Sequence, residues 1–291
     1  MSSLRDIRRR IKSVKNTAQI TKAMQMVAAS KMRKAQEAAL NGRPYAILLN
    51  RVLVSLRNRM DQSLHALLEK RDVKNELVVL LSTDKGLCGA LNTNLFREAT
   101  VFDKQRTKFI SVGRKGTQFL ARTKRDMIAD FPLKDQPTFL ETKAISKFFI
   151  ERFLSGDVDK VTVLFPRFVN TLTQKPTALT LLPITSLEES GLTVPAESPA
   201  PIPQPAGDII FEPNPEQILE HIVPYYVHFE LYQMLLGTRA SEHSARMVAM
   251  KSATDNAKDI VKDLTLEYNK ARQAAITKEL LEISTAQLAL G

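Results

Sequence analysis

Apolar residues recur at helical spacing in the first part of the chain, at Ile7, Ile11, Val14 and Ala18. A period of about 3.6 residues is typical of one face of a helix. A similar stripe resumes further along, so the pattern predicts one long helix over residues 1–70. Only Gly42 and Pro44 interrupt it, and we expect a bend or kink where they stand.

The stretch at residues 20–36, ITKAMQMVAASKMRKAQ, departs from this one-sided pattern. Its apolar side chains point to nearly every side of a helix. A surface helix shows one apolar stripe, whereas a helix that is apolar all round must be enclosed. We therefore expect other protein surfaces to cover this stretch.

The end of the chain predicts a second long helix. From Tyr225 to Gly291 there is no proline and one internal glycine, Gly237, and apolar residues again follow helical spacing. Two such helices at opposite ends of a sequence can bury their stripes on each other as an antiparallel coiled coil. Charges between Arg239 and Glu282 alternate in sign, which is typical of a solvated helix face.

The middle of the chain alternates between strand and helix patterns. Apolar runs predict strands at residues 76–82, 108–112, 125–131, 160–165 and 178–184. Several of these runs are continuous, which is typical of strands buried on both faces. The segments between them have helical character, so we expect a mainly parallel α/β sheet domain over residues 75–187.

A proline-rich stretch at residues 188–208 follows the sheet domain and is typical of a flexible insertion. The remaining segment, 209–291, contains the second long helix. The predicted fold class is therefore α/β. It combines a long antiparallel coiled coil, formed by the N- and C-terminal helices, with a central, mainly parallel, Rossmann-like sheet domain.

Positive charge is concentrated near the start of the chain. Residues 1–40 hold ten basic and two acidic side chains, a net charge of +8 out of +11 for the whole sequence. Such a patch suggests nucleic acid, an anionic membrane or an acidic protein surface. No aromatic residues are interleaved with it for base stacking. No apolar run approaches the roughly 20 residues that span a bilayer, so no direct membrane insertion is expected.

Residues 82–92, STDKGLCGALN, look like a phosphate-binding loop. They follow a predicted strand and open a predicted helix, where free backbone N–H groups attract anions. They match neither common glycine-rich phosphate motif, so a tight turn with a partner contact is favoured over nucleotide binding. Cys88 lies near Lys85 and a helix start, both of which would lower its thiol pKa, but no neighbouring histidine completes a catalytic pair.

No other group of residues has the pattern of an active site. The four histidines are too far apart in sequence for a metal cluster. Arg272, Gln273 and Thr277 place polar donors on a patch otherwise lined by Ala and Ile, and the pattern alone favours ordinary helix surface. The sequence therefore predicts no catalytic, cofactor-binding or metal site, and three classes stay open. They are a non-catalytic partner-binding subunit, a basic coiled-coil nucleic-acid-binding protein, and a nucleotide-dependent enzyme that uses residues 82–92.

Three long motifs resemble one known family. DIRRRIKSVKNTAQITKAMQMVAASKMRKAQ near the start, LSTDKGLCGALNTNLF in the middle, and ASEHSARMVAMKSATDNA with YNKARQAAITKELLEI near the end are similar to the γ subunit of rotary ATP synthases. The similarity covers nearly the whole chain in the family's order. Departures are confined to the proline-rich insertion and to variable surface helices.

The resemblance implies a central rotor shaft without catalytic activity of its own. The two terminal helices would thread a ring of three α and three β subunits, with ATP chemistry in the β subunits. A single copy would also contact the ε subunit and the membrane c-ring, and would bind no cofactor and no nucleic acid. The expected location is peripheral, on the cytoplasmic face of a bacterial inner membrane. The chloroplast form's regulatory dithiol is missing, because Cys88 is the only cysteine.

The resemblance also assigns contact positions. Arg272, Gln273 and Thr277 match a polar group that touches loops of the β subunit, and Met24 matches a position near its acidic lever loop. Lys85 and Cys88 match a collar segment that faces the same loop. In DIIFEPNP, Phe211 and Glu212 match the foot that meets the ε subunit and the membrane ring.

Overall fold

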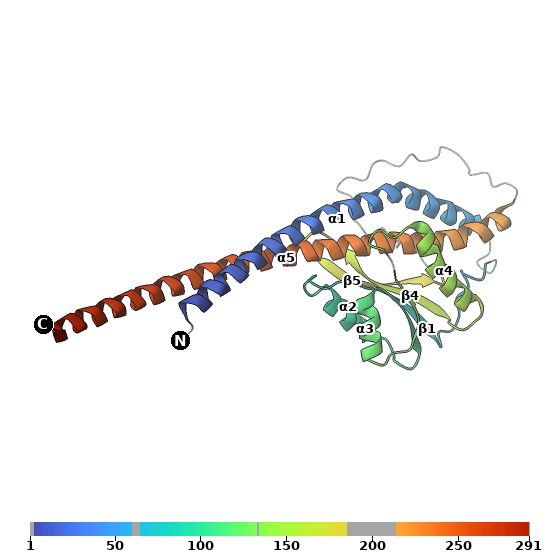
Figure 1. Ribbon diagram of the computed structural model, residues 1–291. Helices are drawn as coiled ribbons and strands as arrows, with labels where there is room; N and C mark the ends of the chain where they lie inside the picture. Colours follow the sequence, from blue (N-terminus) through green and yellow to red (C-terminus); the bar gives the residue numbers. More distant parts are fainter. Residues whose placement is uncertain (1–2, 60–64, 133, 185–213, 291) are drawn as a thin grey trace. The chain divides into compact units, whose positions relative to one another are not determined.

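The computed structural model describes residues 3–59, 65–132, 134–184 and 214–290. Within these ranges the chain forms five helices and five strands (Figure 1). They are α1 (Leu4–Arg59), β1 (Glu76–Leu81), α2 (Leu91–Ala99), β2 (Thr107–Val112), α3 (Arg114–Arg122), β3 (Met127–Phe131), α4 (Phe139–Leu154), β4 (Lys160–Phe168), β5 (Gln174–Leu182) and α5 (Pro215–Leu290).

The elements belong to two compact units. The terminal unit combines the start of α1, up to Val27, with the end of α5, from Met247. The sheet unit holds residues 28–246, and thus the sheet together with the inner parts of both long helices. The sequence analysis divided the chain by its local character instead, into segments 1–70, 75–187, 188–208 and 209–291. Side-chain patterns alone do not show which part of a long helix packs on the sheet.

The sheet unit contains a single sheet with strand order β3-β2-β1-β4-β5 among the described residues. The pairs β3–β2, β2–β1 and β1–β4 are parallel, and β4–β5 is antiparallel. The predicted mainly parallel α/β domain is confirmed. The last strand begins at Gln174 rather than at residue 178, because its first residues are polar and lie at the edge of the sheet.

Strand β1 shows why its apolar run is continuous. Leu77, Val79 and Leu81 face the core shared with α4 and the inner parts of α1 and α5, whereas Val78 and Leu80 face the core shared with α2 and α3. Successive side chains of a strand point to opposite faces. With helices on both faces of the sheet, every position of β1 from Leu77 to Leu81 is apolar (Figure 1).

Within the sheet unit, α1 and α5 run antiparallel. Tyr45 meets Phe229 with ring centroids 5.0 Å apart, and Ala39 packs with Leu236 in one small core. Between them lies Gly42, where an added Cβ would stand 2.1 Å from Nε2 of Gln233. A side chain at this position would require the end of the Gln233 side chain to move.

The terminal unit shows the same antiparallel order. Arg8 donates a hydrogen bond of 2.5 Å to the Tyr268 hydroxyl, and the hydroxyls of Thr21 and Thr254 are 2.7 Å apart. Later residues of α1 thus contact earlier residues of α5, as expected of antiparallel helices. The predicted coiled coil of the two chain ends is confirmed in this unit.

Both long helices differ from their predicted bounds. Helix α1 continues through Gly42 and Pro44 but does not extend to residue 70, because His65–Leu68 form a turn that buries Leu67 in the core. Helix α5 begins at Pro215, earlier than the proline-free stretch suggested. Proline is tolerated in a first helical turn. The Asn214 side chain caps this end by accepting the backbone N–H of residue 217 at 2.8 Å.

Candidate functional site

The loop after β1 lies at the edge of the sheet where ligands bind in many doubly wound folds. Strand β1 is central, with β2 on one side and β4 on the other, so its carboxyl end marks a switch point of the topology. The loop is tightly folded. The backbone N–H of Gly116 donates to Oγ of Ser82 at 2.8 Å, and that hydroxyl donates to the carbonyl of Gly113 at 3.0 Å.

Helix α5 occupies the space beside this loop. Arg246 donates to the carbonyl oxygens of Lys85 at 3.2 Å and Gly86 at 3.3 Å. The carboxylate of Asp84 accepts the N–H of Arg114, the first residue of α3, at 3.1 Å. A helix start is where a phosphate would bind, and here the chain's own carboxylate takes that place. The loop after β1 is thus held by contacts within the chain, and Asp84 occupies the start of α3.

Three charged residues of α5 form a buried network behind the loop. Glu242 accepts hydrogen bonds of 2.8 Å from both Arg239 and Arg246, and Arg239 also lies 3.4 Å from Asp84. All three α5 side chains are buried. Removing one partner from a buried ion pair typically costs about 3–5 kcal/mol, because a charge is left without compensation. This part of α5 is therefore held firmly against the loop.

His243 extends the network, and its tautomer follows from its neighbours. Arg246 Nη1 lies 3.3 Å from Nδ1 of His243. A guanidinium can only donate, so Nδ1 must accept and the ring proton is on Nε2. That nitrogen lies 3.2 Å from the carboxylate of Asp135. Burial is the main cause that lowers the pKa of His243, and the neutral ring is the form that fits.

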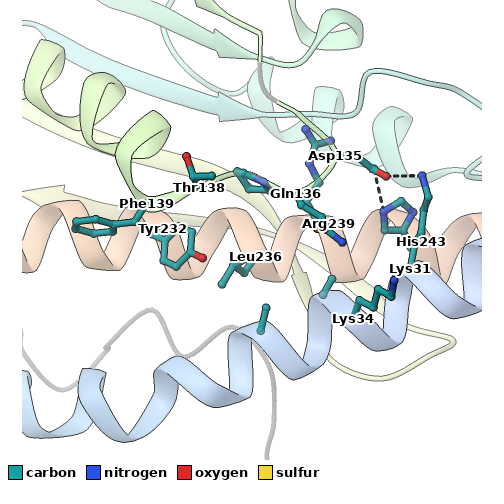
Figure 2. A pocket seen from close by; sticks show the side chains of 13 residues that line it. Lys31, Lys34, Asp135, Gln136, Thr138, Phe139, Tyr232, Leu236, Arg239 and His243 are labelled. Atoms are coloured by element: carbon teal, nitrogen blue, oxygen red, sulfur yellow. Dashed lines mark hydrogen bonds and ion pairs between the residues drawn. The ribbon is translucent and has the colours of Figure 1, made fainter.

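Asp135 joins the two long helices through its carboxylate. It accepts from His243 on α5 and also pairs with Lys31 on α1 (Figure 2). Burial opposes its ionisation, but the hydrogen bond from Lys31 and the neighbouring positive charges outweigh burial and lower its pKa. The loop before α4 is thereby tied to both helices inside the sheet unit.

The charged network was not predicted from the sequence. The alternating charges after Arg239 suggested a solvated face, but Arg239, Glu242 and Arg246 are buried. The spacing of three and four residues between them was the available signal, because it allows one carboxylate to pair with both cations. Their burial depends on a loop more than 150 residues away in sequence, which no local pattern reveals.

Two of the predicted contact positions lie in the loop after β1. The Lys85 side chain is exposed while its carbonyl oxygen points inward to Arg246. Cys88 is only 3% exposed, and burial raises the pKa of its thiol despite the nearby Arg246. The expectation of a lowered thiol pKa is therefore wrong. Whether these two positions touch a partner stays a prediction.

The other described contact positions lie in the terminal unit. Met24 is half-buried, and its neighbours Met26 and Val27 are 59% and 55% exposed. Arg272 and Gln273 are exposed. These assignments stay predictions. Phe211 and Glu212, like the proline-rich stretch, lie outside the described residues.

Beyond Tyr268, α5 has almost no facing helix in its own unit. Because Arg8 already meets Tyr268, the start of α1 at Leu4 is reached within about one further turn of α5. The later apolar side chains of α5 are exposed, namely Ile276, Leu280, Leu281 and Ile283. Thr277 is also exposed, and its hydroxyl donates back to the carbonyl of Gln273 at 2.9 Å.

Two further features are absent from the described part of the chain. No group of three or more His, Cys, Asp or Glu side chains there is placed to hold a metal ion. No helix within it combines the length and the apolar character needed to cross a bilayer.

Comparison with known proteins gives one family along the whole chain. A family model described as ATP synthase matches residues 3–290. Proteins named ATP synthase gamma chain from Opitutus terrae and Methylacidiphilum infernorum are each 50% identical, and the alignments cover 99% and 100% of this chain and the same shares of theirs. The corresponding protein of Akkermansia muciniphila is 46% identical over the full length of both chains.

Solved structures share the fold. A chain in the central stalk and c-ring structure of Tetrahymena thermophila mitochondrial ATP synthase has a TM-score of 0.61 and 27% identity, covering 80% of this chain and 99% of that one. A chain of Euglena gracilis mitochondrial ATP synthase, in rotational state 3, has a TM-score of 0.66 and 22% identity, covering 99% and 94%.

Proposed function

Because this chain belongs to the ATP synthase gamma-chain family, we propose that it is the central-stalk rotor subunit of a bacterial ATP synthase. It transmits rotation between the membrane ion-driven ring and the catalytic β subunits, and so couples ion transport to ATP synthesis or hydrolysis. The observation that carries the proposal is the pair of chain ends in the terminal unit, which leaves apolar side chains uncovered.

The exposed apolar residues of the terminal unit form a surface that a partner protein could bury. On α1 they are Ile20, Met26 and Val27, at 60%, 59% and 55% exposure. On α5 the exposed stretch from Ile276 onward has no partner helix in its own unit. Exposed apolar patches of this kind mark interaction surfaces. A ring of α and β subunits around the helix pair would cover both helices, which accounts for the apolar stretch at residues 20–36.

The same surface suits a part that turns inside its partners. Apolar contacts are non-directional, so they hold the shaft without fixing one angle. The predicted contact positions would supply the angle-dependent contacts, with Met24, Lys85 and Cys88 near the acidic lever loop of β. Arg272, Gln273 and Thr277 would touch β loops nearer the tip. Each β subunit would then change its nucleotide affinity according to the contacts that it receives.

The remaining partners follow from the family. We assign one copy per complex, with a foot that includes Phe211 and Glu212 and meets the ε subunit and the c-ring. ATP chemistry is assigned to the β subunits, and this chain carries no cofactor. The complex would hold it peripherally on the cytoplasmic face of the inner membrane. The +8 charge of residues 1–40 would then face acidic protein loops rather than nucleic acid.

Reconstitution with α and β subunits tests the proposal. The full chain should copurify with both and yield a complex that hydrolyses ATP, whereas the chain alone should not. Ile20→Asp and Met26→Asp should impair formation of the complex, because each buries a charge under the proposed cover. Val101→Asp is the matched control, because Val101 is 79% exposed on the sheet unit.

All three variants should leave the isolated chain as stable as the wild type. ATP hydrolysis by the isolated chain, or equal assembly of Met26→Asp and Val101→Asp with α and β, would contradict the proposal.

A further inference from the structure

A pocket in the sheet unit lies between the two long helices and the loop before α4. Its volume is about 430 Å³, within the range of sites that bind small molecules. Helix α1 contributes residues from Lys31 to Ala38, the loop and first turn of α4 contribute residues 135–139, and α5 contributes residues from Tyr232 to His243.

The pocket has an apolar end. Phe139 and Tyr232 meet edge to face there, with ring centroids 5.8 Å apart and an interplanar angle of 88°. Leu236 lies beside them, toward the middle of the pocket (Figure 2). This corner suits a flat apolar group, because aromatic rings pack well against one another edge to face or offset.

The other end of the pocket is polar and carries more cations than anions. Lys31, Lys34 and Arg239 line it, and Asp135 is the one carboxylate among the lining residues. That carboxylate already pairs with Lys31 and His243 (Figure 2). Lys34 makes no ion pair with any described residue, so its ammonium group is available to a ligand.

We propose that this pocket binds a small amphipathic organic anion, whose apolar body lies against Phe139 and Tyr232 and whose acidic group meets Lys34. A carboxylate or sulfonate fits this arrangement, because a charge-assisted hydrogen bond to an ammonium group is stronger than a neutral one. A cation would be repelled at the same end. The site is independent of the rotor function proposed above.

Fluorescence titration of the full-length chain with 8-anilinonaphthalene-1-sulfonate tests the proposal. We expect one saturable site. Lys34→Glu should weaken the affinity by about tenfold or more, the size expected for losing a hydrogen bond to a charged group. Ala35→Leu should abolish saturable binding by filling the pocket. Lys15→Glu is the matched control, because it makes the same charge change at an exposed position of α1 in the terminal unit.

Displacement separates anion recognition from general apolar adhesion. 2-Naphthoate should displace the dye, and 2-naphthalenemethanol, which has no charge, should not. Circular dichroism should show that each variant keeps its helix content. Absence of saturable binding, equal affinities of Lys34→Glu and Lys15→Glu, or equal displacement by the two naphthalene compounds would each overturn the proposal.

Discussion

His228 is a buried histidine that should make stability depend on pH. Its Nδ1 lies 2.7 Å from the Ser146 hydroxyl, and burial lowers its pKa from 6.5 to about 4. The unfolded chain therefore binds a proton at a higher pH than the folded chain does. Stability is full above pH 6.5 and falls as the pH drops from 6.5 towards 4. At pH 5 this loss should reach about 2 kcal/mol.

Urea unfolding at pH 7 and pH 5 measures the effect. His228→Gln should reduce the difference in unfolding free energy between the two values of pH. His221→Gln, at an exposed position of the same helix, is the control and should leave the difference unchanged. If the unfolding free energy differs between pH 7 and pH 5 by the same amount in both variants, His228 is not the source of the pH dependence.

Three glycines of the sheet unit form a graded series. Gly113 has a φ of 101°, and an added Cβ would lie 2.5 Å from the carbonyl oxygen of Ser82. Gly156 has a φ of 76° with open space, and Gly86 has open space without a positive φ. Replacing Gly113 by Ala should lower the free energy of unfolding by more than about 3 kcal/mol. The same change should cost about 1 kcal/mol at Gly156 and less than about 0.5 kcal/mol at Gly86. Thermal or urea unfolding of the three variants checks this order, and a Gly113→Ala variant as stable as Gly86→Ala would contradict it.

At the scale of single residues, the sequence predicted little of the candidate site. The buried pairing of Glu242 with Arg239 and Arg246 looked like surface charge, because the residues that bury it come from distant loops. Cys88 was judged by its sequence neighbours, whereas its pKa is set mainly by burial. Burial is a property of the folded chain, so neither result could be read from local spacing.

The pairing of the two chain ends gives a test at the scale of elements. The hydroxyl oxygens of Thr21 on α1 and Thr254 on α5 are 2.7 Å apart, so the two side chains face each other and we expect cysteines at these positions to meet. Thr21→Cys/Thr254→Cys should crosslink on mild oxidation, both in the isolated chain and in the assembled complex. Migration on non-reducing gels and mass spectrometry of the linked peptide measure the yield.

Thr21→Cys/Asp255→Cys is the matched control. Asp255 follows Thr254 directly but is exposed, so its side chain points away from the shared face. Equal crosslinking in both pairs would show that the helices do not keep this register.

The elements themselves were largely predictable. Strand β1 was found because helices on both faces make its whole run apolar, and the antiparallel pairing followed from the length of the two terminal patterns. The ends of the long helices were less accessible. Helix α5 begins before Pro224, although a proline inside a pattern normally suggests a boundary. Gly42 suggested an interruption, whereas α1 continues through it and the Gln233 side chain of α5 lies against it.

Charge gives a test at the scale of the whole molecule. If acidic loops of the partner subunits attract the basic start of the chain, association with α and β should slow as ionic strength rises. Arg9→Glu/Arg10→Glu should slow association at low salt and reduce its salt dependence, because both side chains are exposed. Stopped-flow fluorescence or surface plasmon resonance measures the rate.

Lys104→Glu/Lys124→Glu in the sheet unit is the control for total charge. Both of these side chains are exposed. This variant should associate at nearly the wild-type rate. If both double variants slow association equally, net charge rather than the basic start of the chain controls the rate.

The buried position of Cys88 has a practical consequence for watching this molecule at work. The sequence has a single cysteine, and its sulfur is shielded from solvent. A maleimide fluorophore attached to an engineered surface cysteine will therefore mark one known point on the chain without removal of the native residue. Such a label, read by polarised single-molecule microscopy, can report directly whether the chain turns while ATP is consumed.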